Sequence, residues 1–198
     1  AGEAWPKVTD ILTYEVAGKR VGLLGMGYVG RCSARLFRAV GAEVWAFDPY
    51  LTPERAVELG VHKADLDDVL RSCPIISVHL PVTDETRHLL GARELALIAD
   101  GAVFVNTARA WVVDQDAMVR ELATGRFWAA LDVFDPEPLP ADHPLRAMPN
   151  VLLTPHVAGR TVDSHQGLMA AMIDEVERLA KGQPLRYPIT RDMLATMA

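Results

Sequence analysis

Polar residues that could carry out redox chemistry lie at or shortly after the ends of short apolar runs. Arg109, Asp132, Glu137 and His156 all have this placement. If the apolar runs are strands of one parallel sheet, their carboxyl ends face a common crevice, where such sheets bind ligands. A cation, two carboxylates and an imidazole in one crevice suit hydride transfer to a carbonyl group beside a carboxylate.

The reduction of a 2-oxo acid gives each of these residues a role. Arg109 can hold the substrate carboxylate with a bidentate pair of hydrogen bonds and places positive charge near the carbonyl oxygen. His156 can donate a proton to that oxygen, while Glu137 binds the other imidazole nitrogen and stabilises the imidazolium. Asp132 is placed to accept a hydrogen bond from a nicotinamide carboxamide. The hydride itself belongs to the cofactor.

Each residue also has an ordinary structural interpretation. Arg109 could be a surface arginine, His156 could cap the following helical region, and Glu137 could be a solvated acid in a proline-rich loop. Asp132 could be an N-cap or loop acid. His79 ends an apolar run, and we expect it to bond to backbone and not to act in catalysis. Neither a serine hydrolase nor a metal site is indicated, because no serine has a base partner and no H-x-x-x-H or C-x-x-C spacing occurs.

The stretch from Lys19 to Asp48 predicts a binding site for the cofactor. It reads KRVGLLGMGYVGRCSARLFRAVGAEVWAFD and predicts a strand, a glycine turn, a helix and a second strand that ends at an acid. In this context Gly25, Gly27 and Gly30 form the dinucleotide-binding fingerprint G-x-G-x-x-G, with the helix N-terminus facing the diphosphate. Asp48 can accept hydrogen bonds from the adenosine ribose and would repel a 2′-phosphate. We therefore expect NAD and not NADP.

The remaining sequence alternates between strand and helix patterns. Strands are predicted at 20–24, 43–47, 74–80, 101–106, 128–133 and 151–153. Helices are predicted at 28–40, 53–59, 65–72, 92–98, 114–124 and 161–181. Because most strands are apolar throughout, we expect a Rossmann-like, doubly wound parallel α/β sheet buried on both faces. The predicted organisation is a linker at 1–18, one NAD-binding domain at 19–182 and a tail at 183–198.

Composition and charge limit the classes of partner and the cellular compartment that we expect for this protein. The 198 residues are 50% hydrophobic and 23% charged, with a net charge of −6, which suits a single globular domain. Without a run of basic residues or an apolar run of membrane-spanning length, we expect neither nucleic acid nor membrane as a partner. Cys32 and Cys73 have no metal or redox spacing and suit a reducing compartment, so we expect a cytoplasmic protein.

The chain resembles the cofactor domain of the D-isomer-specific 2-hydroxyacid dehydrogenases. The resemblance covers about residues 17–186 and rests on GKRVGLLGMGYVG, VHLPVTDET, FVNTARAWVVDQDAM, ALDVFDPEPLP and NVLLTPHVAGRT. It implies an NAD-dependent oxidoreductase acting on a D-2-hydroxy or 2-oxo acid, with Arg109, Glu137 and His156 as catalytic residues. Besides the fingerprint glycines, it implies cofactor contacts at Tyr28, Val29, Asp48, Leu80, Thr107, Asp132 and Gly159.

The sequence departs from this family at particular positions and in its length. The family usually has glycine directly after the arginine, where this chain has Ala110, followed by the bulky Trp111. Arg160 occupies a position that is often a small or hydroxyl residue. Trp111 and Arg160 are placed to shape either the substrate pocket or a subunit contact. Because only 18 residues precede the stretch from Lys19 to Asp48, we expect most of the family's substrate domain to be absent and the tail to return toward it. Such a fragment should bind NAD(H) but turn over 2-oxo acids poorly.

The resemblance also implies a homodimer formed near residues 83–125, and it leaves other functions open. Some relatives act as NAD-sensing transcriptional corepressors, so a non-catalytic NAD-sensing module is the main alternative. The intact set of Arg109, Glu137 and His156 argues against it, because a sensor does not need these residues. A third possibility is another NAD enzyme with a similar domain, such as an S-adenosylhomocysteine hydrolase. The segment ALDVFDPEP and the later TPH favour the dehydrogenases over such an enzyme.

Overall fold

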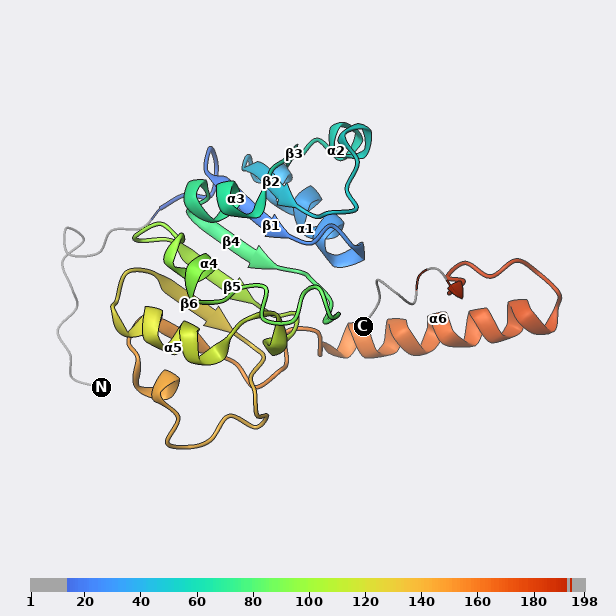
Figure 1. Cartoon of the computed structure of the whole chain (residues 1–198). Coiled ribbons are helices and arrows are strands. Elements are labelled where there is room, and N and C mark those ends of the chain that lie inside the picture. The colour runs from blue at the N-terminus through green and yellow to red at the C-terminus, as the bar shows by residue number, and fades with distance from the viewer. Residues whose placement is uncertain (1–13, 192, 194–198) are drawn as a thin grey trace.

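A seven-stranded sheet forms the centre of the molecule in the computed structural model, which describes residues 14–191 and 193 (Figure 1). All neighbouring strands are parallel, in the order β3-β2-β1-β4-β5-β6-β7. The strands are β1 (Arg20–Leu24), β2 (Glu43–Phe47), β3 (His62–Lys63), β4 (Ile75–Val78), β5 (Val103–Asn106), β6 (Trp128–Leu131) and β7 (Val151–Leu153). This confirms the predicted doubly wound fold, whose strand order reverses between β1 and β4, where such sheets bind ligands.

Helices α1 to α5 lie between consecutive strands along the chain and α6 follows the last strand, and local capping fixes where several of them begin. They are α1 (Tyr28–Ala39), α2 (Pro53–Leu59), α3 (Leu66–Ser72), α4 (Ala92–Ala96), α5 (Gln115–Ala123) and α6 (Val162–Ala180). Thr52 accepts a hydrogen bond from the backbone N–H of Arg55, and Asp114 accepts one from Ala117. These side chains satisfy N–H groups that the first helical turn leaves without partners.

Three short elements of the structure were not predicted from the sequence. The two-residue strand β3 pairs with β2, and 3₁₀ helices cover Ala110–Val112 (η2) and Pro144–Ala147 (η3). The sequence predicted strand residues at 74–80, but β4 covers only Ile75–Val78. Strand β3 and the two 3₁₀ helices have too few positions to show a hydrophobic period, so their absence from the prediction has a simple cause.

Helices cover the two faces of the sheet unequally. On one face, α1 and α2 pack over β1 and β2, where Val21, Leu23 and Val44 are almost fully buried. On the other face, α3 lies over β1 and β2, and it shares with α4 and α5 a larger core that contains Phe104 and Leu122. The buried apolar surface of both clusters is the main source of stability of the sheet.

The expectation that most strands are buried on both faces is wrong for β5, β6 and β7. Phe104 and Leu131 are buried beneath the helices. On the opposite face Val103, Trp128 and Leu152 expose 37%, 55% and 65% of their surface. Because β5 and β7 both flank β6 in register, these side chains share one face of the sheet. The described helices leave that face open.

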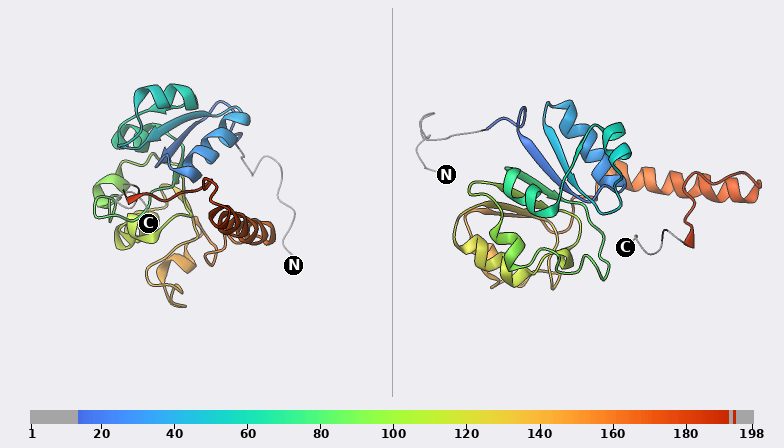
Figure 2. Two further views of the ribbon diagram at one scale, coloured as in Figure 1. Left: turned by 90° about the vertical axis from the view of Figure 1, so that its right-hand side faces the viewer. Right: turned by 45° about the horizontal axis from the view of Figure 1, so that its top comes forward.

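Helix α6 projects from the carboxyl edge of the sheet into solvent, as both figures show (Figures 1 and 2). None of its residues is buried, and Leu168, Met172 and Val176 are all more than half exposed. The segment after it turns back along the helix, where Arg186 pairs with Asp174 at 3.0 Å. Helix α6 therefore adds almost nothing to the core of the sheet.

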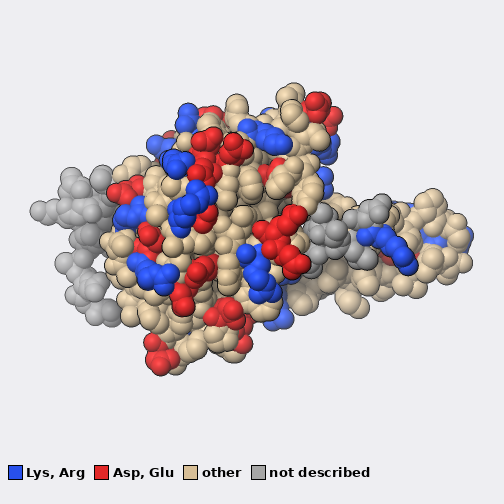
Figure 3. All heavy atoms as spheres, in the orientation of Figure 1, with Lys and Arg blue, Asp and Glu red and all other residues tan. Residues whose placement is uncertain are grey.

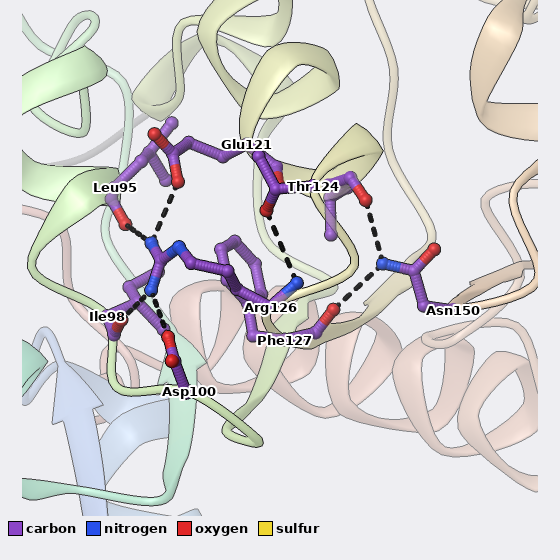
Figure 4. Close-up of polar contacts among 9 residues, drawn as sticks. Leu95, Ile98, Asp100, Glu121, Thr124, Arg126, Phe127 and Asn150 are labelled. Atoms are coloured by element: carbon purple, nitrogen blue, oxygen red, sulfur yellow. Dashed lines mark hydrogen bonds and ion pairs between the residues drawn. The ribbon is translucent and has the colours of Figure 1, made fainter.

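Polar contacts join the loops at the amino ends of the strands (Figure 4). The Arg126 guanidinium donates hydrogen bonds to Asp100 at 2.7 Å and to Glu121 at 2.8 Å, linking the segments that follow α4 and α5. The buried amide of Asn150 donates to the carbonyl oxygen of Phe127 at 2.9 Å. The amino edge is thus tied together by side chains, while the carboxyl edge carries the candidate site.

Acidic and basic side chains are interspersed on the face of the molecule that Figure 3 shows. Among the described residues, none of the helices combines the length and apolar character needed to cross a membrane.

Candidate active site

A pocket of about 360 Å³ lies at the carboxyl ends of β1, β2 and β4, and its lining includes the glycine loop. Gly25 has a φ of +100°, a backbone conformation that residues other than glycine rarely adopt. A Cβ atom at Gly30 would overlap the carbonyl oxygen of Gly25, whereas a Cβ at Gly27 would have nothing within 4 Å. The loop therefore packs tightly beneath Gly30 and leaves open space above Gly27, as a bound diphosphate requires.

Asp48 connects the end of β2 to the glycine loop. Its carboxylate accepts hydrogen bonds from the backbone N–H of Met26 at 2.7 Å and of Tyr50 at 2.8 Å. Asp48 and the buried Leu80 both line the pocket. This geometry fixes a negative charge beside the loop that is to bind the diphosphate.

The N-terminus of α1 adds to this fit. Tyr28 and Val29, in its first turn, are 70% and 63% exposed, and no acidic residue occurs there. Free N–H groups and the helix dipole at such an end favour an anion. The glycine cradle, the acid and the helix end together fit a dinucleotide.

His79 lies beneath this pocket, but its side chain differs from expectation. Its backbone N–H donates to Leu24 at 2.7 Å, as a strand residue should. Its Nε2 atom, however, is buried and has no hydrogen-bond partner among the described residues, so the predicted bond to backbone is not made by this atom. Burial lowers the pKa of the imidazole and favours its neutral form.

His156 and Glu137 form a hydrogen-bonded pair. Nδ1 of His156 lies 2.8 Å from Oε2 of Glu137, and Oε1 of Glu137 accepts the Phe134 N–H at 3.0 Å. Desolvation raises the pKa of Glu137, but the bonds from His156 and Phe134 outweigh it and lower the pKa overall. Because the ionised carboxylate can only accept, Nδ1 carries the hydrogen and Nε2 stays available to a ligand.

Asp132 holds the segment that carries His156. It is only 1% exposed, and its carboxylate accepts from Thr154 Oγ1 at 2.5 Å, from the Val157 N–H at 2.9 Å and from the Ala158 N–H at 3.0 Å. Desolvation raises the pKa of Asp132, but these bonds lower it overall. This positioning role was not predicted from the sequence, because the partners lie 22 to 26 residues away. Its contact with a carboxamide stays a prediction.

Arg109 is positioned by the buried side chain of Asn106. The Asn106 amide donates to the Arg109 carbonyl oxygen at 3.0 Å and accepts from the Ala108 N–H at 3.0 Å, which shapes the turn after β5. Arg109 then lines a cavity of about 310 Å³ together with Glu137 and His156. The structure thus brings the predicted catalytic residues together. Asn106, a polar residue ending a buried strand, was the signal for this turn.

The two bulky departures from the family pattern, Trp111 and Arg160, line different cavities. Trp111 lines the same 310 Å³ cavity as Arg109. Arg160 lines a separate hollow of about 700 Å³, which meets the other side of Glu137 and His156. Glu137 and His156 therefore line both hollows, and Trp111, unlike Arg160, shares the cavity with Arg109.

Thr107 and Gly159 lie outside the cavities described above. Thr107 is exposed after β5. Gly159 is exposed near the start of α6, where its carbonyl oxygen accepts from Ser164 at 2.9 Å. Their cofactor contacts stay predictions. Within residues 14–191 and 193, no cluster of histidine, cysteine or acidic side chains could hold a metal ion.

Comparison with known proteins agrees with this geometry. Residues 1–158 match the family model described as "D-isomer specific 2-hydroxyacid dehydrogenase, NAD binding domain". Glyoxylate reductase of Aeropyrum pernix is 40% identical over 98% of this chain and 59% of its own length. D-3-phosphoglycerate dehydrogenase of Bacillus subtilis is 40% identical over 88% of this chain and 33% of its own.

A solved structure gives the same result. D-lactate dehydrogenase with NAD⁺ from Lactobacillus jensenii superposes with a TM-score of 0.80 at 32% identity, covering 94% of this chain and 60% of that one. The chain thus spans between a third and three fifths of the length of these relatives. The chain belongs to the D-isomer-specific 2-hydroxyacid dehydrogenase family and contains its Rossmann-like NAD-binding domain.

Proposed function

We propose that this chain is the NAD-binding part of an NAD-dependent D-2-hydroxyacid dehydrogenase, which interconverts a 2-oxo acid and a D-2-hydroxy acid. The observation that carries this proposal is the cavity shared by Arg109, Glu137 and His156, with His156 bonded to Glu137. Relatives named glyoxylate reductase, D-3-phosphoglycerate dehydrogenase and D-lactate dehydrogenase support it. No observation favours the non-catalytic NAD-sensing alternative.

The residues of the cavity can divide the reaction between them. Arg109 binds the substrate carboxylate and places positive charge near the carbonyl oxygen, where negative charge develops. His156 donates the proton on Nε2 to that oxygen, while Glu137 stabilises the charged imidazolium before the proton leaves. The chemistry that NAD(H) supplies when bound is hydride transfer to or from the carbon that carries the oxygen. In the reductive direction one hydride and one proton convert C=O to CH–OH.

The protein's surroundings and assembly belong to the same proposal. Cys32 and Cys73 are free thiols in the structure, which supports a reducing compartment such as the cytoplasm. The family resemblance supports a homodimer formed near residues 83–125, and the open sheet face with Val103, Trp128 and Leu152 is a second exposed apolar surface. The proposed partner is a small 2-oxo or 2-hydroxy acid, with no role for nucleic acid or membrane. Sedimentation as a strict monomer would contradict the dimer.

One experiment tests the proposed activity and cofactor together. NADH binding is measured by fluorescence titration, and NADH oxidation is followed with protein in excess over cofactor, in the presence of glyoxylate or pyruvate. We expect NADH to bind and to be oxidised slowly. His156→Asn should keep NADH binding and lower the oxidation rate by about 10²-fold or more, because the proton donor is lost. Failure to bind NADH, or an unchanged rate in His156→Asn, would contradict the proposal.

A further inference from the structure

We propose that Trp111, held in position by Arg87, forms an apolar wall of the substrate cavity and selects 2-oxo acids with an uncharged, apolar side chain. This inference rests on the proposed function, because it concerns the same cavity. It adds a substrate class: acids with an alkyl or aromatic substituent are preferred over acids that carry a second anionic group.

The first support is the position of Trp111. It lies two residues after Arg109 in η2 and lines the 310 Å³ cavity with Arg109 and His156. Trp111 is 43% exposed, a large value for a bulky apolar residue beside a candidate catalytic group. A substrate carboxylate held by Arg109 would place the rest of the acid within this cavity. Trp111 is thus placed to contact the substrate side chain.

The second support is the way the tryptophan is fixed. The guanidinium carbon of Arg87 lies 4.4 Å from the centroid of the indole ring, which is cation–π geometry. The Trp111 carbonyl oxygen accepts the His88 N–H at 2.8 Å, and the Leu90 N–H donates to Val112 at 3.1 Å. Backbone and side chain therefore both hold the wall against the loop at 87–90. Arg87 does not itself line the cavity.

The third support is the charge of the remaining lining. Val82, Ala110, Val133 and Phe134 are apolar, and the acidic side chains are Asp135 and Glu137. Once Arg109 binds the substrate carboxylate and His156 serves the carbonyl oxygen, no further basic side chain remains in the cavity lining. A phosphate or second carboxylate would meet apolar surface and negative charge, both of which disfavour it. An apolar side chain would instead bury surface against Trp111.

The test uses three acids and the NADH-loaded chain. The acids are 4-methyl-2-oxopentanoate, with a branched apolar side chain; 2-oxoglutarate, of similar size with a second carboxylate; and glyoxylate, with no side chain. Binding of each acid is measured by the change in NADH fluorescence. We expect 4-methyl-2-oxopentanoate to bind at least about tenfold more tightly than 2-oxoglutarate.

Two variants and a matched control assign the preference to the wall. Trp111→Ala should weaken binding of 4-methyl-2-oxopentanoate by about tenfold, while glyoxylate and NADH bind as before. Arg87→Met should act in the same direction and less strongly, because the indole is retained but no longer held by the cation. Trp128→Ala, which removes an exposed tryptophan on the open sheet face, should leave all three affinities unchanged.

The outcomes separate this inference from the function on which it rests. A wild-type preference for 2-oxoglutarate would overturn the inference. Equal losses for glyoxylate and 4-methyl-2-oxopentanoate in Trp111→Ala would also overturn it, because the effect would then be general damage to the site. In both cases the proposed function would stand, since 2-oxo acids would still bind. If the NADH-loaded chain bound none of the three acids, the proposed function would fail and the inference with it.

Discussion

The imidazole Nδ1 of His156 lies 2.8 Å from a carboxylate oxygen of Glu137, 19 residues earlier in the chain. This contact joins the loop after β6 to the loop after β7. It uses one ring nitrogen for orientation and leaves Nε2 available for proton transfer. His156 also has a positive φ of 54°, an uncommon conformation for a residue other than glycine. The surrounding loop contacts therefore hold the ring in a defined position.

Replacing Glu137 with glutamine tests the importance of its charge. Glutamine can still bond to the ring, but it cannot stabilise an imidazolium electrostatically. We expect Glu137→Gln to lower the rate of NADH oxidation by 2-oxo acid by about 10²-fold and to leave NADH affinity unchanged. Glu177→Gln, on exposed helix α6, is the matched control and should retain the wild-type rate. If Glu137→Gln retained the wild-type rate, the charge of Glu137 would have no part in proton transfer.

Replacing Asp132 with asparagine should destabilise the protein in a pH-dependent way. The folded-state pKa of Asp132 lies below its usual value of 3.8, so its contribution to stability is present above that value and is lost as pH falls through the folded pKa. Asparagine presents an NH₂ group to N–H donors, so we expect the free energy of unfolding to fall by about 1–3 kcal/mol at pH 7. Urea unfolding followed by circular dichroism measures this. If the difference in free energy of unfolding between wild type and variant stayed constant below pH 3, the lowered pKa of Asp132 would be contradicted.

The sequence predicted the fold well wherever a local pattern specifies the structure. Strands β1, β2 and β7 and helix α2 begin and end where the sequence predicted, because glycine, proline and capping residues mark their ends. The open face of β5 to β7 could not be predicted in this way. Trp128 and Leu152 are as apolar as core residues, and only the placement of the helices shows that nothing described covers them.

The candidate site was predictable in part for a related reason. Parallel strands bring their carboxyl ends to one edge, so Arg109 and His156 could be placed in one crevice before any coordinates were known. The positioning role of Asp132 and the stacking of Arg87 on Trp111 depend on contacts between distant segments. No spacing in the sequence records such contacts. The burial of the His79 Nε2 atom without a partner among the described residues was unpredictable for the same reason.

Replacing Asp48 with serine should relax the choice of cofactor. The Asp48 carboxylate is held beside the glycine loop by the N–H groups of Met26 and Tyr50, where it would repel a 2′-phosphate. We expect the wild-type chain to bind NADH much more tightly than NADPH and Asp48→Ser to narrow the ratio of dissociation constants by about tenfold or more. Fluorescence titration with both cofactors measures the ratio. An unchanged ratio would show that other residues determine cofactor choice.

Replacing Arg109 with lysine should weaken substrate binding. Lysine keeps the positive charge but lacks the planar fork that binds both oxygens of a carboxylate. We expect the apparent affinity for glyoxylate to fall by about tenfold or more in Arg109→Lys, while NADH binds as before. Arg120→Lys, on helix α5, is the control, since Arg120 does not line the cavity. Equal loss of NADH and glyoxylate binding would indicate damage to the fold and not to the carboxylate site.

Substitutions in α6 and in the core should differ sharply in their effect on stability. Met172 on α6 is 58% exposed, whereas Leu122 on α5 is 1% exposed within the main core. Met172→Gln should change the free energy of unfolding by no more than about 0.5 kcal/mol, as at other exposed positions. Leu122→Ala should cost about 2–5 kcal/mol, because it leaves a cavity among buried side chains. Urea unfolding of both variants measures the difference. A loss of several kcal/mol in Met172→Gln would show that α6 packs against the sheet or another chain in solution.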